Sequence, residues 1–167
     1  TVTSALGTPP DYAGSQVALL HVTTLSHHLT LVEGGNALSD FRAAALLARV
    51  RAVAPAVTGV AARYVHVVAS EEPLRDEVRE TVGRLLTYGE AYAGPVAGPG
   101  VVTIVVAPRL GTVSPWASKA TDIAHVCGLP AVTRIERAIA YTVAGEGELT
   151  AIGAAIADML ALRDADS

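Results

Sequence analysis

The residue types best suited to chemistry gather between residues 111 and 129. This stretch holds the chain's only Trp and only Cys, one of its five His, and a Lys. Ser114 followed by Pro115 predicts that a helix begins here. A Ser side chain accepts the backbone N–H groups left free in the first turn, and Pro suits the first helical position.

This helix start has two interpretations that the sequence leaves open. In the first, the free N–H groups together with Ser118 and Lys119 bind a phosphate or a carboxylate, because the N-terminus of a helix carries partial positive charge. In the second, Ser114 only caps the helix, Trp116 packs and Lys119 is solvated. Thr121 and Asp122 follow within the next turn and belong to the same candidate surface.

Cys127 is expected to be a buried structural residue, because free Cys is usually buried. A thiol nucleophile needs an activating base. His125 cannot serve as that base, since side chains two residues apart on a helix diverge by about 200°. Cys127 is therefore not assigned a catalytic role.

The remaining polar residues give weaker indications. Arg134, Glu136 and Arg137 lie close together on one predicted β-segment, which favours ion pairs at an interface. His66 is expected to be a hydrogen-bonded sheet histidine. His27 and His28 point apart on a strand, so no metal site is expected. The glycines lack the spacing and the following Lys of a phosphate-binding loop, so ATP binding by this chain is not indicated.

Composition limits the function classes. The chain has 167 residues, a length typical of one domain, and a net charge of −4 that argues against nonspecific nucleic-acid binding. A single Cys cannot form an internal disulfide, so the natural compartment is the cytoplasm. No apolar run approaches the ~20 residues that a membrane-spanning helix needs, so no membrane association is expected.

Apolar periodicity predicts an α+β fold in which strands and helices alternate. The predicted strands are residues 17–22, 29–32, 57–69, 101–106 and 132–143. The predicted helices are residues 37–53, the stripe Leu74, Val78, Val82 and Leu85, the helix after Ser114, and the stripe Leu149, Ile152, Ile156 and Leu160. Gly34-Gly35-Asn36 is expected to break the strand before it, and the loop 93–100 to separate two halves of similar order.

Five stretches of the chain resemble, in the same order, the N-terminal domain of large PurL-type phosphoribosylformylglycinamidine synthases. They are Leu38-Ser39-Asp40-Phe41-Arg42, Tyr64-Val65-His66-Val67-Val68, Leu85-Leu86-Thr87-Tyr88-Gly89, residues 111–129, and Arg134-Ile135-Glu136-Arg137. The chain departs from the family pattern at Ala117, Val126 and Ala138.

The resemblance implies a fold and a domain organisation. It implies two similar β-α-β-α halves, a fused pair of PurS-like subunits, with an antiparallel sheet covered by helices. The PurS-like domain would span residues 1–145, with halves at about 14–90 and 98–145, and residues 146–167 would form a C-terminal helix or the start of a linker. Enzymes of this family are much longer, so we expect the chain to be one domain of a larger enzyme.

The resemblance also implies a role. The complete enzyme uses ATP, Mg and glutamine to convert formylglycinamide ribonucleotide to the amidine, and the glutaminase nucleophile lies in another domain. This domain would dock the synthetase domain to the glutaminase domain and help to shield the passage of ammonia, with no catalytic residue, cofactor or metal of its own. The interface candidates are Ser114, Trp116, Ser118, Lys119, Thr121, Asp122, His125, Arg134, Glu136 and Arg137.

Two alternative functions remain open. One is a free-standing PurS-like assembly subunit that serves separate synthetase and glutaminase chains. The other is a non-catalytic module that binds an anion or a nucleotide at the Ser114 helix. A reading frame that continues far beyond Ser167 would favour the multidomain enzyme over both.

Overall fold

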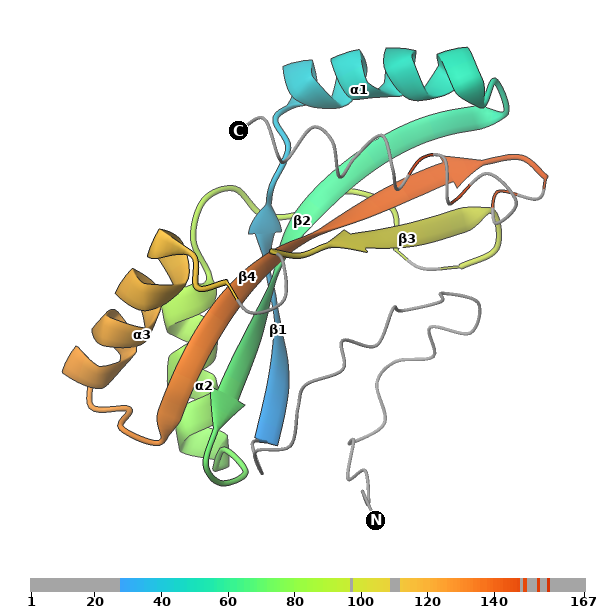
Figure 1. The fold of residues 1–167 in the computed structure, drawn as a ribbon. Helices are drawn as coiled ribbons and strands as arrows, with labels where there is room; N and C mark the ends of the chain where they lie inside the picture. The colour runs from blue at the N-terminus through green and yellow to red at the C-terminus, as the bar shows by residue number, and fades with distance from the viewer. Residues whose placement is uncertain are drawn as a thin grey trace.

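The fold is an antiparallel four-stranded sheet with helices between its strands (Figure 1). The computed structural model describes residues 28–96, 98–108 and 112–147, together with Leu149, Gly153 and Ile156. The elements in chain order are β1 His28–Asn36, α1 Asp40–Val53, β2 Val57–Ser70, α2 Asp76–Leu86, β3 Val101–Val106, α3 Pro115–Val126 and β4 Val132–Gly145. The strands are arranged in the order β1-β2-β4-β3. This architecture confirms the predicted α+β class.

Most predicted elements agree with the structure within a few residues. β3 has the predicted bounds, and β2 is one residue longer than predicted. The strand predicted at residues 17–22 lies outside the described residues, as does most of the last predicted helix, of which Gly153 and Ile156 are helical.

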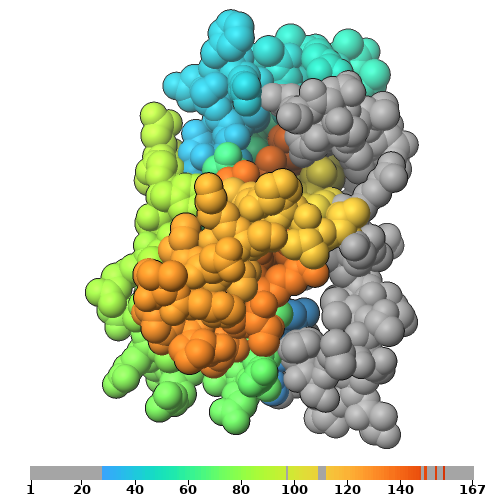
Figure 2. Space-filling model, turned by 60° about the vertical axis from the view of Figure 1, so that its left-hand side comes forward, coloured from blue at the N-terminus to red at the C-terminus, as the bar shows by residue number. Residues whose placement is uncertain are grey.

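Helices α1, α2 and α3 pack on one face of the sheet. The β2–β4 register pairs His66 with Arg137 and Val68 with Ile135 and is continuous from Val60 to Ala69, so alternate residues share a face. That face carries the buried residues that contact α1 at one end of the sheet and α2 and α3 at the other. Figure 2 shows α1 across the top of the molecule and α3 facing the viewer.

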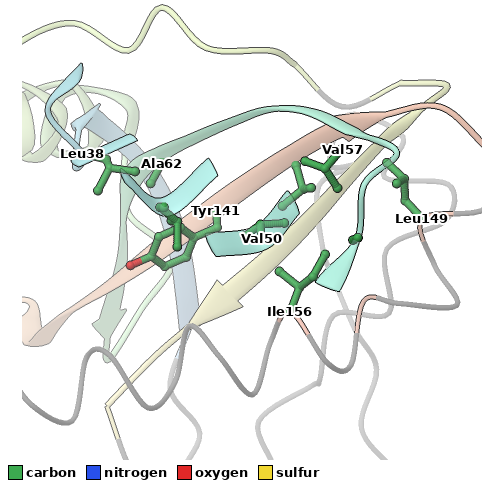
Figure 3. Close-up of a cluster of buried hydrophobic side chains, with 10 residues drawn as sticks. Leu38, Val50, Val57, Ala62, Tyr141, Leu149 and Ile156 are labelled. Carbon is green, nitrogen blue, oxygen red and sulfur yellow. The ribbon is translucent and has the colours of Figure 1, made fainter. Parts of the chain in front are cut away.

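The core on this face has two parts. The first lies under α1 and contains Val50, Val57 and Tyr141, joined by Leu149 and Ile156 (Figure 3). The second lies under α2 and α3 and contains Val68, Val82 and other residues that include Ala124, Leu129, Val132 and Ile135. Tyr64, His66 and Arg137 occupy the same face between these two parts.

A regular interval relates the first and second parts of the chain. α1 and α3 begin at Asp40 and Pro115, and β2 and β4 begin at Val57 and Val132, so both pairs are 75 residues apart. The antiparallel register also pairs Tyr64 with Ile139, which are separated by the same interval. The edge strands are less alike, because β1 has nine residues and β3 has six.

The prediction that residues 34–36 break the first strand is wrong. β1 continues through Asn36, with an irregularity in the ladder between Glu33 and Asn36. The glycines serve a close contact instead: a Cβ on Gly35 would lie 2.5 Å from the Glu90 carbonyl oxygen, and one on Gly34 would lie 2.7 Å from the His66 ring. The loop after α2 can therefore pass directly against β1, where Asn36 N–H donates to the Glu90 carbonyl at 2.7 Å.

Candidate functional site

Helix α3 is fixed at both ends by its own sequence. The Ser114 hydroxyl accepts a hydrogen bond from Ala117 N–H at 3.0 Å, and Pro115 is the first helical residue, as predicted. At the other end, Leu129 N–H donates to the Ala124 carbonyl and Gly128 N–H to the His125 carbonyl, while Gly128 has φ +80°. These two bonds form a Schellman motif that returns Leu129 to the core.

The expectation that Cys127 is buried is wrong, because Cys127 is exposed. The reason is the Schellman turn, in which Cys127 is the C-cap residue and Leu129 is the side chain that re-enters the core. The neighbouring Val126 is also exposed. The prediction relied on the general tendency of free Cys to be buried. It did not consider that the turn after α3 directs Leu129, and not Cys127, into the core.

A cluster of aromatic rings surrounds Arg137 beneath the start of α3. This Arg137 cluster consists of Tyr64, His66, Tyr88, Trp116 and Arg137. The Arg137 guanidinium carbon lies 4.6 Å from the centre of the Tyr64 ring and 4.6 Å from that of the Trp116 ring. A guanidinium between two ring faces is attracted to both of them, and each such contact contributes roughly 0.5–2 kcal/mol.

Hydrogen bonds inside the cluster place His66 in one form. His66 Nδ1 lies 3.3 Å from the Val32 carbonyl, which can only accept, so Nδ1 carries the proton. His66 Nε2 then accepts from the Tyr88 hydroxyl at 3.0 Å, and that hydroxyl oxygen accepts from Arg137 at 3.4 Å. The imidazole is neutral in this arrangement, and the predicted hydrogen-bonded sheet histidine is confirmed.

Electrostatics support the neutral imidazole. His66 is fully buried and its ring stacks on Trp116, with ring centres 5.5 Å apart. Burial is the main cause that lowers the pKa of His66 below its ordinary value; the hydrogen bond to the Val32 carbonyl opposes this effect, and the positive charge of Arg137 adds to it. The cluster therefore packs the Arg137 guanidinium and three aromatic rings around the buried, neutral His66, between the two parts of the core.

Three predicted interface residues connect α3 to the sheet and to neighbouring backbone. Thr121 donates from its hydroxyl to the Ala117 carbonyl at 2.8 Å and accepts from Ile135 N–H on β4 at 3.0 Å. His125 Nε2 donates to the Val132 carbonyl at 2.6 Å. Through these contacts Thr121 and His125 hold α3 in position. Ser114 caps the N-terminus of the same helix.

Arg134, Glu136 and Arg137 are not brought together as one group. Arg134 forms an ion pair with Glu136 and donates to the Thr112 carbonyl at 2.8 Å. Arg137 points to the opposite face of β4, toward His66 and Trp116. Alternation along the strand predicts this separation.

The outward side of α3 carries the other candidates. Ser118, Lys119 and Asp122 are exposed, and within the described residues neither Lys119 nor Asp122 forms an ion pair. Apolar residues lie on the same exposed helix, with Ile123 50% and Val126 89% exposed. The α3 surface, defined as Ser118, Lys119, Asp122, Ile123 and Val126, thus mixes one positive and one negative charge with exposed aliphatic side chains.

Sequence reasoning did not assemble the Arg137 cluster. Tyr64 and His66 are two residues apart on β2, so strand alternation predicts that they share a face. Tyr88, however, follows α2, and Trp116 belongs to α3. Only the fold brings these segments to the same place. Within the described ranges, no three His, Cys, Asp or Glu side chains are grouped so that they could hold a metal ion.

The family model for the N-terminal domain of formylglycinamide ribonucleotide amidotransferase matches residues 63–165. The chain belongs to this family. The match covers well over half of the chain and includes most of β2 together with α2, β3, α3 and β4. Membership in the amidotransferase family places the chain in the context of a purine-biosynthesis enzyme. The matched residues include every member of the Arg137 cluster.

None of the helices in the described part of the chain combines the length and the apolar character needed to cross a membrane.

Proposed function

We propose that this chain is the domain that docks the synthetase domain of a formylglycinamide ribonucleotide amidotransferase to its glutaminase domain and helps to shield the passage of ammonia. The observation that carries the proposal is the match of residues 63–165 to the N-terminal family of that enzyme. The domain would position the other domains and would not catalyse a step itself. The complete enzyme would work in the cytoplasm and would bind ATP and Mg in a domain other than this one.

The α3 surface supports a docking role at this place. Its aliphatic side chains, Ile123 and Val126, are exposed on a helix whose other side is packed against the sheet. Lys119 and Asp122 form no ion pair with another residue that the structure describes, and they would pair with groups of another domain. Protein interfaces use both apolar contacts and polar contacts, and this surface exposes side chains of both kinds.

A PurS-like origin of the two halves is part of the same proposal. The shared 75-residue interval between α1 and α3 and between β2 and β4, and the pairing of Tyr64 with Ile139, are what a fused pair of PurS-like units would give. The same features suit the free-standing assembly subunit. An anion-binding module is less favoured, because Ser114 already accepts the Ala117 N–H that an anion at the α3 start would use.

The test is the double variant Lys119→Ala, Asp122→Ala in the complete enzyme. We expect less amidine formed per glutamate released, because ammonia escapes when the domains dock poorly, and turnover with free ammonium that stays unchanged. An exposed charge pair contributes up to about 1 kcal/mol, so glutamine-dependent turnover should fall about fivefold. The matched control is Arg79→Ala, Glu80→Ala on the exposed side of α2.

Coupling that stays complete in the α3 double variant would contradict the docking role of the α3 surface. A loss of turnover with free ammonium as well as with glutamine would also contradict it, because that pattern indicates damage to the synthetase step.

A further inference from the structure

Helix α1 carries an open surface built from an aromatic side chain and two arginines. Phe41 is 85% exposed, the most exposed of the chain's described aromatic side chains. A hollow beside it is lined by Phe41, Arg42, Ala45, Leu46 and Arg49. These five residues are called the α1 surface below.

At the corresponding positions of α3, the side chains pack toward the sheet. Displaced by the same 75 residues, Phe41 corresponds to Trp116, Arg42 to Ala117 and Arg49 to Ala124. Ala117 and Ala124 are buried, and Trp116 is partly buried against the core beneath α3. Of the α3 positions that face the sheet, those that correspond to Arg42, Ala45 and Arg49 are exposed in α1. Leu46, which corresponds to Thr121, still faces the sheet.

The arginines explain the difference. A guanidinium cannot be buried in an apolar core without a partner, since removing a charge from water is costly. α1 instead buries Leu46 and Val50 against the sheet. Neither Arg42 nor Arg49 forms an ion pair among the described residues. The two positive charges lie on one stripe of α1 with Ala45, beside the exposed phenyl ring of Phe41.

We propose that the α1 surface is a docking site for a segment of another domain of the same enzyme, one that places an apolar side chain between two carboxylates. The apolar side chain would fill the hollow against Phe41, and the carboxylates would pair with Arg42 and Arg49. Charge complementarity selects this partner, because the two arginines line the hollow from either side of Ala45. The inference rests on the proposed docking function and adds a second surface to it.

The test is photo-crosslinking from position 41 in the complete enzyme. Phe41→p-benzoylphenylalanine keeps an aromatic ring at the site, and mass spectrometry identifies the crosslinked peptide. The expected product joins residue 41 to a segment outside residues 1–167 that contains an aliphatic or aromatic residue between acidic ones. Crosslinks confined to this chain, crosslinks to a second copy, or no crosslink at all in an enzyme that retains turnover with free ammonium would each overturn the proposal.

Charge reversal tests the complementary carboxylates. Arg42→Glu with Arg49→Glu should lower the crosslink yield about tenfold, because like charges then face each other. Arg42→Lys with Arg49→Lys should retain most of it, and the control Arg79→Glu with Arg84→Glu on α2 should leave it unchanged. A yield that is insensitive to the reversal contradicts the proposed partner chemistry.

The two proposals can fail separately. Full ammonia coupling in the Lys119 and Asp122 variant, together with a crosslink from position 41 to another domain, would reject the α3 surface and retain the α1 surface. Loss of coupling without any interdomain crosslink would do the reverse.

Discussion

Helix α1 has Phe41 at its second residue, and helix α3 has Trp116 at the same position. Trp116 packs on His66 and Arg137 and is partly buried against the core, whereas the side chain of Phe41 is exposed to solvent. The third and tenth helical residues decide this difference: they are alanines in α3 and arginines in α1. The matching helices α1 and α3 thus turn different sides toward the same sheet. The side of α1 that carries Phe41, Arg42 and Arg49 remains exposed to solvent.

The caps of the two helices differ as well. Ser39 and Ser114 both stand at the N-cap position, but only the Ser114 side chain forms a capping hydrogen bond. A Ser cap contributes typically ~1 kcal/mol. α3 is therefore the better fixed of the two helices at its start.

The largest effect should come from truncating the two aromatic residues in turn. Trp116→Ala should lower the free energy of unfolding of the chain by about 3 kcal/mol, because it removes a ring packed on His66 and Arg137. Phe41→Ala should change it by no more than about 0.5 kcal/mol, since its side chain is solvated. Urea unfolding measures both. Equal losses in the two variants would show that the contrast between α1 and α3 is mistaken.

The next effect concerns the loop that carries Tyr88 to the α3 end of the sheet. Gly35→Ala should cost about 2 kcal/mol, because the new methyl group would meet the carbonyl oxygens of Glu90 and Tyr88, both of which belong to the backbone. Gly83→Ala on α2 is the control; nothing lies near its Cβ position, and it should stabilise the helix by roughly 0.5–1 kcal/mol. A Gly35 variant as stable as the native chain would mean that the loop adjusts freely.

A smaller effect should appear in the pH dependence of stability at the α3 end. Burial lowers the pKa of His66, so the unfolded chain binds a proton at a higher pH than the folded chain does. The free energy of unfolding is then fully retained above about pH 6.5 and decreases as the pH falls below it, by at most about 1.4 kcal/mol per pH unit.

His66→Gln should remove this part of the pH dependence, and the control His125→Gln should retain it. Urea unfolding at pH 7.5, 6.5 and 5.5 measures the three proteins. A native curve with the same slope as the His66 variant would contradict a neutral, buried His66.

The sequence was sufficient for the elements whose signals are local. Ser114 with Pro115 predicted the start of α3, and the β-branched run before Pro108 predicted β3. Alternation along residues 132–143 is also a local signal, and it is sufficient to place Ile135 and Arg137 on one face of β4. The physical reason is that caps and periodicity act within a few residues.

The rest depended on contacts between distant segments. Gly34 and Gly35 were taken for a strand break, although their role is to admit the Glu90 loop against β1. The Arg137 cluster combines side chains from β2, β4, α3 and the segment after α2. The exposure of Phe41 follows from which face α1 turns to the sheet, and the pattern of alanines on that helix specifies no single face.

Side-chain labelling tests most directly whether other domains cover these surfaces. Lys119 is the only lysine of the chain, so its acylation reports on the α3 surface, and hydroxyl-radical oxidation of Phe41 reports on the α1 surface. Both rates are compared between the 167-residue chain and the complete amidotransferase, with the urea transition of the chain establishing that it is folded. We predict that both labelling rates fall severalfold in the complete enzyme. Equal rates for Lys119 and Phe41 in the chain and in the complete enzyme would contradict the docking account.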